Sequence, residues 1–266
     1  MISFLFKRNI FKINQMCFST FMDSKGIKCD VINMHSSDKE DCSSGGAYSK
    51  LQNTLENNLN LTEEELLSKI KKNCRYDIRR CEREGVEHKV YYKDVLTDSD
   101  IIKRFQLTYN KMFNDKNVPG YQFNINLIYS GVKSGNIVIT ACWPKEQTDL
   151  VVYHAYLCDE KRTMLLYSAS PLWSDGDKQT ANVIGRVNKY SHWNDMLWFK
   201  NHRYDCYEWG GIHSVENPNG IDKFKMEFGG ELISYYNYTI PKSILGFAYV
   251  KLVKLRSKRH KAHLDK

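Results

Sequence analysis

Three β-rich runs follow one another between residues 136 and 168, and this feature restricts the fold more than any other. The runs are NIVITACW at 136–143, LVVYHAYL at 150–157 and TMLLYS at 163–168. β-branched and aromatic residues favour strands, and the turns between these runs are short and polar. The sequence therefore predicts an antiparallel meander.

A helical pattern precedes the meander. Thr62 and Glu65 have the spacing of a capping box, in which each side chain bonds the other's free backbone N–H, and Gly85 is a natural C-terminal stop. We expect one helix from Thr62 to about Glu84. Its buried stripe at 100° per residue consists of Leu66, Leu67, Ile70, Cys74, Ile78 and Cys81.

Further elements complete the pattern. We expect a strand at 86–95, a helix at 99–114, a long helix at 179–202, a strand at 206–209 and another at 232–235. Helices and strands in this order predict an α+β or α/β sandwich with a mixed sheet. Residues 24–60 carry the weakest pattern, so ordered structure is expected to begin at Thr62.

Composition limits the class of protein. The chain has 266 residues, 42% of them hydrophobic, and a net charge of +8. This argues against a disordered or multi-span membrane protein and favours an anionic partner, which can be a phosphate, a nucleic acid or an acidic membrane surface. An acid-free, basic leader before Asp23 has the character of a mitochondrial transit peptide, but a frayed or strand-forming start is preferred. The eight cysteines form no C-x-x-C motif, which favours reduced cysteines in a cytoplasmic protein.

A basic stripe lies on the helix expected at 62–84. Lys72, Arg75, Arg79 and Arg83 share one arc, and only Glu82 lies near enough to offset them. Like charges at this spacing repel one another. The stripe is either a solvated face or a site that binds phosphate, and the two readings have about equal weight.

The helix expected at 179–202 places a charge on its apolar side. Its apolar arc contains Val183, Val187, Tyr190, Trp193, Leu197 and Trp198. Arg186 falls inside this arc, and a buried guanidinium requires a carboxylate, a carbonyl or a ligand. A structural partner is favoured over a ligand. His192 and Asp195 lie on the more polar side, where a solvated or capping role is expected.

Two short segments have the residue types of a reactive site. In YEWGGI, Gly210 and Gly211 permit positive φ or close approach of a ligand to the backbone, and Glu208 is suited to act as a general base or to hold an amine. The alternative is a plain turn with Glu208 in solvent or paired with Arg186. In IDKFKMEFGGE, Lys225 lies among apolar residues, where a lysine has a lowered pKa or acts as a cation beside an oxyanion.

These segments resemble a known family. GRVNKYSHWNDMLWFK, YEWGGI and GIDKFKMEFGGE, with the upstream LTEEELLSKIKKNCRYDIRRCEREGV, resemble the Fem-type transferases, which build peptidoglycan bridges on the GNAT acyltransferase fold. The resemblance runs from about Leu61 to Tyr238. It implies a GNAT-like α+β fold with a mixed, largely antiparallel sheet flanked by helices and a reduced N-terminal lobe.

The resemblance also implies a function. The chain is expected to move an aminoacyl or acetyl group onto an amine of a cell-envelope precursor that bears phosphate. The donor is aminoacyl-tRNA, which makes tRNA a partner, or acetyl-CoA, and no tightly bound cofactor or metal is expected. The family's functional Phe-Lys pair falls on Phe224 and Lys225. With Glu208 these are the candidate catalytic residues, and the candidate substrate-binding residues are Lys72, Arg75, Arg79, Arg186, His192, Trp209, Gly210 and Gly211.

The chain departs from the family pattern in several places. It has no counterpart of the helical arm associated with tRNA, Glu208 replaces the usual Asp, and no pyrophosphate-binding loop is evident, which leaves residues 170–178 as the candidate for donor phosphate. The implied organisation is a partial or poorly ordered segment at 1–60, an acyltransferase domain at 61–240, and a helix with a basic tail at 241–266.

Two other functions remain open. One is acetyl-CoA-dependent N-acetylation in surface polysaccharide synthesis, and the other is a non-catalytic basic module that binds polyanions. The apolar 244–255 and the basic KLRSKRHK at 254–261 suit peripheral contact with an anionic membrane, or else a last packed helix. The oligomeric state stays open.

Overall fold

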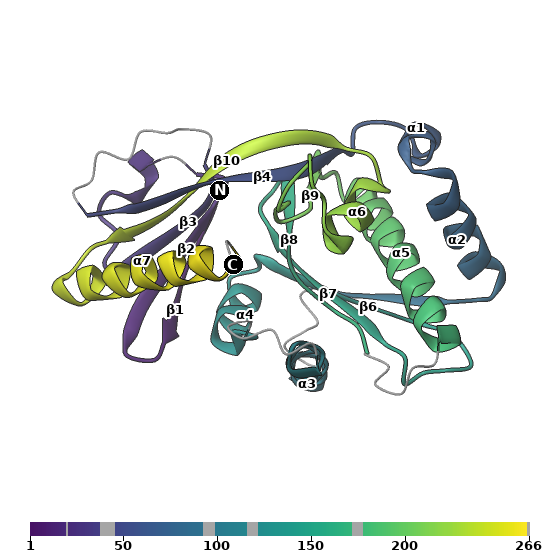
Figure 1. Cartoon of the computed structure of the whole chain (residues 1–266), viewed down its shortest axis with the longest axis horizontal. Coiled ribbons are helices and arrows are strands. Elements are labelled where there is room, and N and C mark those ends of the chain that lie inside the picture. The colour runs from purple at the N-terminus through teal and green to yellow at the C-terminus, as the bar shows by residue number, and fades with distance from the viewer. Residues whose placement is uncertain (20, 38–45, 93–98, 116–121, 172–177, 265–266) are drawn as a thin grey trace. The chain divides into compact units, whose positions relative to one another are not determined.

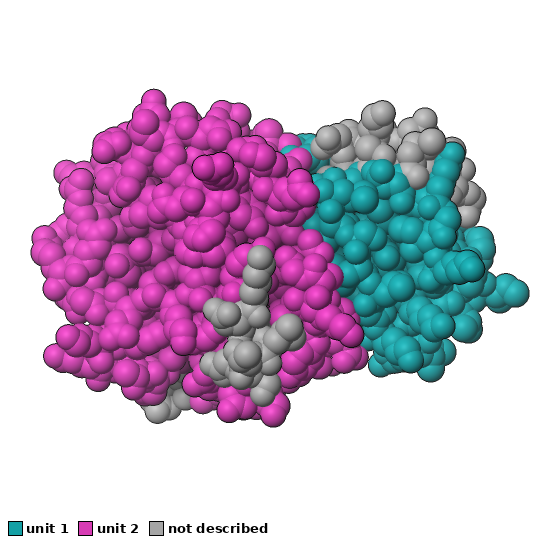
Figure 2. All heavy atoms as spheres, turned by 180° about the vertical axis from the view of Figure 1, so that it is seen from behind, with its two compact units in different colours: residues 1–53, 234–266 teal, residues 54–233 magenta. Residues whose placement is uncertain are grey.

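The computed structural model describes residues 1–19, 21–37, 46–92, 99–115, 122–171 and 178–264, with the backbone alone at 21–22, 36–37, 99 and 256–264. The chain forms two compact units, which Figure 2 colours separately. The terminal unit consists of Met1–Asn53 and Ser234–Lys266, and the central unit is Thr54–Ile233. The N-terminal segment and the C-terminal helix, which the sequence pattern separated, therefore belong to one unit.

The terminal unit begins with a strand at Ile2, so the expectation that order begins at Thr62 is wrong. In the first strand Ile2, Phe4 and Phe6 are buried while the residues between them are exposed, which is the period of an amphipathic strand. Its strand order is β1-β2-β3-β10-β4, with β2 and β3 parallel. The elements are β1 (Ile2–Arg8), β2 (Phe11–Cys17), a 3-10 turn (Phe21–Ser24), β3 (Val31–Ser37), β4 (Tyr48–Asn58), β10 (Glu231–Pro241) and α7 (Ile244–Leu264).

The central unit contains the expected meander. Strands β6, β7 and β8 pair antiparallel in sequence order, and the full order is β4-β9-β8-β7-β6-β5. Helix α5 lies against β6 and β7 on one face, and α3 and α4 lie on the other (Figure 1). The elements are α1 (Glu63–Lys69), α2 (Lys72–Arg83), β5 (Glu87–Tyr91), α3 (Ser99–Asp115), α4 (Ile125–Lys133), β6 (Ile137–Trp143), β7 (Val152–Cys158), β8 (Arg162–Ala169), α5 (Lys178–Asn201), β9 (Cys206–Glu208) and α6 (Gly220–Met226).

The predicted fold class, an α+β fold with a mixed, largely antiparallel sheet flanked by helices, is confirmed. Strand β1 agrees with the strand-forming start, whereas the pattern did not predict β2–β4 or α4. Among the described helices, none combines the length and the apolar character that crossing a bilayer requires. The seven described cysteines are free thiols.

The helix expected at 62–84 is two helices. The capping box is present, with Thr62 Oγ1 3.2 Å from the Glu65 amide and Glu65 Oε2 2.7 Å from the Thr62 amide. Ile70 is extended and ends α1, and Lys71 donates its N–H to the Glu227 carbonyl at 2.7 Å. This contact with the α6 end, which no local pattern indicates, separates α1 from α2.

The end of α2 follows the prediction. Gly85 has φ of +67°, and the N–H groups of Gly85 and Val86 bond the carbonyls of Glu82 and Cys81, which is a Schellman motif. Five of the six residues of the predicted stripe are buried, and Leu67 is partly buried.

A parallel pair of strands positions the candidate site. β8 leads through α5 to β9, and the two strands pair in parallel over only three residues, Arg162–Met164 with Cys206–Glu208. The pairing of β9 with β8 ends at Glu208, and on the other side of β9 the Trp209 N–H bonds the Leu55 carbonyl of β4 at 3.0 Å. β8 continues to Ala169 without β9 beside it.

Candidate functional site

The turn after β9 holds the side chain of Lys225. Lys225 Nζ donates to the carbonyl oxygens of Trp209 at 2.7 Å and of Gly211 at 2.5 Å. Gly210 and Gly211 have φ of +72° and +111°, which confirms that this turn requires positive φ. The Gly-Gly pair thus turns two carbonyls toward one ammonium group.

Helix α6 carries Lys225 and is anchored by a buried carboxylate. Asp222 forms a capping box with Asn219 and accepts further hydrogen bonds from the amides of His213 and Ser214 at 2.9 and 3.3 Å. Burial lowers the pKa of Lys225 to about 8, although Asp222 and Glu208 act in the opposite direction. Near physiological pH, Lys225 is therefore mostly an ammonium ion, and a part of it is the neutral amine.

Trp209 and Phe224 pack around this lysine. The fully buried Trp209 indole donates Nε1–H to Asn57 Oδ1 at 2.7 Å, and the Asn57 amide donates to the Phe228 carbonyl at 3.0 Å. Phe224 is half-buried, and its ring lies 5.6 Å from that of His192. Trp209, predicted to bind substrate, thus has its polar atom committed to a structural bond.

His192 and Asp195 are buried, so the expectation that they lie on a solvated face is wrong. Their side chains are 2% and 0% exposed. The inner face of α5 carries a polar stripe at positions i, i+3, i+4 and i+7, formed by Asn188, Ser191, His192 and Asp195. This stripe faces polar side chains of β7. The predicted apolar arc packs as well, since Val187 and Trp193 are core residues and its other members are partly buried against the core.

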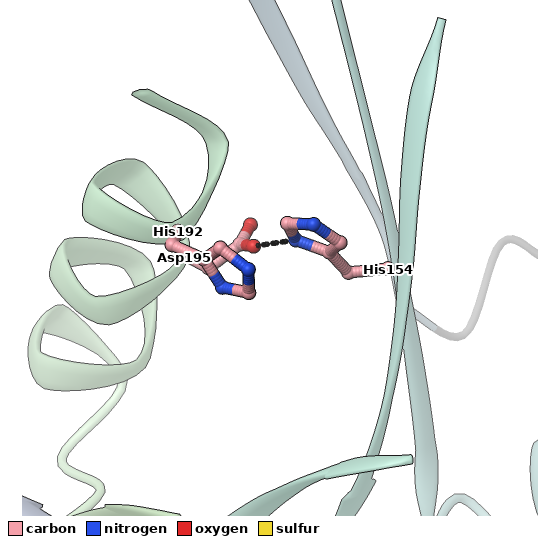
Figure 3. Close-up of side chains that lie close together, drawn as sticks. All are labelled: His154, His192 and Asp195. Carbon is pink, nitrogen blue, oxygen red and sulfur yellow. Dashed lines mark hydrogen bonds and ion pairs between the residues drawn. The ribbon is translucent and has the colours of Figure 1, made fainter. Parts of the chain in front are cut away.

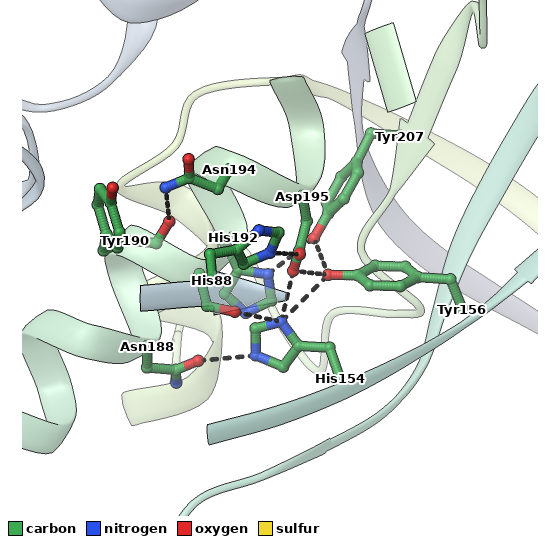
Figure 4. A network of polar contacts seen from close by, with 10 residues as sticks. His88, His154, Tyr156, Asn188, Tyr190, His192, Asn194, Asp195 and Tyr207 are labelled. Carbon is green, nitrogen blue, oxygen red and sulfur yellow. Dashed lines mark hydrogen bonds and ion pairs between the residues drawn. The ribbon is translucent and has the colours of Figure 1, made fainter. Parts of the chain in front are cut away.

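Asp195 is the centre of a hydrogen-bond network, shown in Figure 4. Its Oδ1 lies 2.6 Å from His88 Nε2, and its Oδ2 lies 2.7 Å from His154 Nδ1 and 2.6 Å from the Tyr156 hydroxyl. Burial alone would raise the pKa of Asp195, but the bonds from His154 and His88 hold it below its usual range. Asp195 is therefore a carboxylate.

The network continues to the turn after β9. The Tyr156 hydroxyl lies 2.8 Å from that of Tyr207, which lies 2.7 Å from His192 Nδ1. The His192 ring lies 4.6 Å from the Trp209 ring, measured between centroids. Asp195 is thereby connected to the surroundings of Lys225.

Three members of the network have the residue types of a metal site. His154, His192 and Asp195 offer ligand atoms that lie within 4.8 Å of one another. However, His154 bonds Asp195 directly, as Figure 3 shows, and the two imidazole rings stack with centroids 4.0 Å apart. This is the geometry of a hydrogen-bonded cluster, and the expected absence of a metal stays a prediction.

Arg186 and Glu208 lie in different surroundings. Arg186 Nη2 is 3.8 Å from Glu84 Oε2, which confirms that this partly buried guanidinium meets a carboxylate. Its Nε has no hydrogen-bond partner among the described residues. Glu208 is 3% exposed, so the alternative that it faces solvent is wrong.

The residues of the basic stripe do not form a single site with the groups described above. Arg75 caps the end of α1, since its Nη1 donates to the carbonyls of Ser68 at 3.0 Å and Ile70 at 2.6 Å. Lys72 and Arg79 are exposed. Phosphate binding by this stripe stays a prediction, and most of the loop at 170–178 lies outside the described residues.

Sequence reasoning missed most of the network, namely His88, His154, Tyr156 and Tyr207 on the strands and Asn188 and Ser191 on α5. One signal was available, because His154 and Tyr156 are two residues apart in a buried strand and so share a face. Their partners on α5 follow the helical period. Only the pairing of those two faces in the folded chain reveals the network.

Comparison with known proteins identifies the fold. No family model matches the chain, and no curated protein matches it in sequence. FemX matches with a TM-score of 0.57 and 12% identity over 90% of this chain and 83% of FemX. The C-terminal domain of a putative lysylphosphatidylglycerol synthetase from Agrobacterium fabrum matches with a TM-score of 0.57 and 11% identity over 95% of this chain and 84% of that domain.

A third solved structure agrees. L-PGS from Bacillus licheniformis matches with a TM-score of 0.50 and 12% identity over 94% of this chain and 83% of that one. At these identities the likeness is one of fold. It confirms the GNAT-like fold that the resemblance to Fem-type transferases implied.

Proposed function

We propose that the protein is a transferase that moves an aminoacyl group onto an amine of a phosphate-bearing envelope precursor. The observation that carries this proposal is the ammonium group of Lys225, partly buried and held by two carbonyls of the turn that follows β9. Attack on an acyl ester or thioester creates an oxyanion. A fixed cation in a poorly solvated site stabilises that charge strongly.

The solved structures favour an aminoacyl donor over an acetyl donor. A lysylphosphatidylglycerol synthetase is, by its name, a protein that joins lysine to a lipid, and FemX bears the name of the family that the sequence resembles. We propose aminoacyl-tRNA as the donor, with tRNA as a transient partner and no tightly bound cofactor. Acetyl-CoA is the alternative donor.

A donor comparison tests the function. The purified chain is incubated with a nucleotide-linked peptidoglycan precursor and with either aminoacyl-tRNA or acetyl-CoA, each labelled in the acyl group, and the products are identified by mass spectrometry. We expect label on the precursor amine from aminoacyl-tRNA. Label from acetyl-CoA alone would support the N-acetyltransferase instead. Absence of transfer, with polyanion binding that weakens steeply with salt, would support the binding module.

We also propose peripheral contact between α7 and an anionic membrane. Ile244, Leu252 and Leu255 of this helix are 90%, 50% and 51% exposed and share one arc. The terminal unit holds fifteen lysines and arginines against six acidic residues, so it carries the whole positive excess of the chain. Exposed apolar side chains on a basic unit suit contact with an anionic bilayer surface.

Vesicle sedimentation tests this contact. We expect the chain to sediment with phosphatidylglycerol vesicles and not with phosphatidylcholine vesicles, and the double variant Leu252→Glu, Leu255→Glu to stay in the supernatant. Leu107→Glu, at an exposed position of α3, is the matched control. Equal sedimentation of wild type and double variant would exclude α7 as the contact.

A further inference from the structure

The network between Asp195 and His192 donates hydrogen bonds in one direction only. A carboxylate only accepts, so the Tyr156 hydroxyl donates to Asp195. Because this uses the only proton of Tyr156, the Tyr207 hydroxyl donates to Tyr156. The Tyr207 oxygen in turn accepts from His192, so Nδ1 of His192 carries a proton.

The charges of the neighbouring groups agree with this direction. Burial, reinforced by Asp195, raises the pKa of Tyr156 and Tyr207, which keeps both hydroxyls protonated. Burial, reinforced by His154 and by Lys225 of α6 and opposed by Asp195, holds the pKa of His192 well below its usual value. A neutral imidazole has one N–H, and because Nδ1 holds it, Nε2 is a bare acceptor.

The hydrogen bond that joins His192 to the network is made at Nδ1, which leaves Nε2 outside the network, and the residue is 2% exposed. The ring lies between His154 and the rings of Trp209 and Phe224. A ligand that brings an N–H or O–H group to this acceptor gives it a hydrogen-bond partner.

We propose that His192 Nε2 accepts the proton of the attacking amine, and that Tyr207, Tyr156 and Asp195 are positioning residues that keep the proton of neutral His192 on Nδ1. This inference rests on the proposed function. The amine nitrogen forms the new C–N bond and the C–O bond of the donor ester breaks. The proton that the nitrogen loses passes to Nε2 and then to the leaving oxygen, so His192 ends neutral.

Asp195→Asn tests the positioning residues, because an amide can donate where a carboxylate cannot. With Asn Nδ2 donating to the Tyr156 oxygen, the direction of each hydrogen bond in the chain reverses. Tyr156 then donates to Tyr207, and Tyr207 donates to Nδ1 of His192. The proton of neutral His192 therefore moves to Nε2. Nitrogen-15 NMR of the histidine side chains distinguishes the two tautomers. We expect Nδ1–H in the wild type and Nε2–H in Asp195→Asn.

Transfer activity is measured on the same samples. We expect kcat of Asp195→Asn to fall about 10²–10⁴-fold, the usual contribution of a positioned general base, with KM within about threefold. In Tyr207→Phe, which keeps the buried carboxylate, kcat should fall about tenfold. This variant replaces Asp195→Asn in the test if Asp195→Asn does not fold. Tyr76→Phe, at an exposed position of α2, is the control and should match the wild type.

The outcomes separate this inference from the proposed function. Nε2–H in the wild type would overturn the inference whatever the activity, and so would wild-type kcat in both Asp195→Asn and Tyr207→Phe. If the wild type shows Nδ1–H but transfers nothing from any donor, the proposed function fails and the proton-accepting role fails with it, while the direction of the hydrogen bonds stands.

Discussion

Replacing Lys225 by methionine should lower kcat for acyl transfer by about 10²–10³-fold, the usual cost of losing one group that stabilises an oxyanion. Methionine keeps most of the side-chain volume and removes the charge that the carbonyls of Trp209 and Gly211 position. Steady-state transfer with saturating donor and acceptor measures the effect.

The matched control lies on the same helix. Lys223 is exposed on α6, and Lys223→Met should leave kcat unchanged. Circular dichroism and urea unfolding establish that both variants fold. Full activity in folded Lys225→Met would remove this lysine from the mechanism and the main support for the proposed transferase.

The pH dependence follows from the lowered pKa of Lys225. The ammonium form is the one that stabilises an oxyanion, and a pKa of about 8 means that this form is lost as the pH rises through 8. We expect kcat to decline above pH 8 in the wild type. Lys225→Arg should retain part of the activity without this decline, because a guanidinium group does not titrate in this range. If kcat of Lys225→Arg declined with the same midpoint pH as the wild type, the decline would be due to the titration of another group.

The parts of the fold that the sequence predicted are those with a strong local signal. The meander, the capping box at Thr62 and the stop at Gly85 each depend on residues close together in the chain. The break between α1 and α2 depends on the Glu227 carbonyl, more than 150 residues away in sequence. A periodicity argument cannot detect such a contact, so two helices were read as one.

The same distinction between local and long-range signals applies to the residues of the candidate site. Gly210 and Gly211 were predicted because a glycine pair directly after an aromatic strand is unusual in itself, and Lys225 because its segment also resembles the Fem-type transferases. Asp195 was not predicted to be buried, because its partners lie on β5 and β7 and none is near it in sequence. From sequence alone, an aspartate in a helix is expected at the surface, because burial of a carboxylate requires hydrogen-bond partners. Here those partners lie on distant strands, and only the folded chain brings them to the helix.

Gly210→Ala should be the most destabilising small substitution at the site. Gly210 has φ of +72°, which L-residues with a side chain rarely adopt, and a Cβ would collide with the Leu165 carbonyl oxygen of β8. Because both the strain and the clash involve backbone, neither is relieved by a side-chain rotation. We expect the free energy of unfolding to fall by about 3 kcal/mol, measured by urea denaturation.

Gly185→Ala provides the opposite case with the same added methyl group. Gly185 lies within α5, and a Cβ there would meet no atom within 4 Å. Alanine is more favourable than glycine in a helix interior, so this variant should be more stable than the wild type by about 0.5–1 kcal/mol.

Equal stability of Gly210→Ala and the wild type would mean that β8 and the Trp-Gly-Gly turn do not approach each other closely enough for this clash. The two carbonyls would then no longer be fixed in place to hold Lys225, and the geometry on which the proposed transfer depends would be lost.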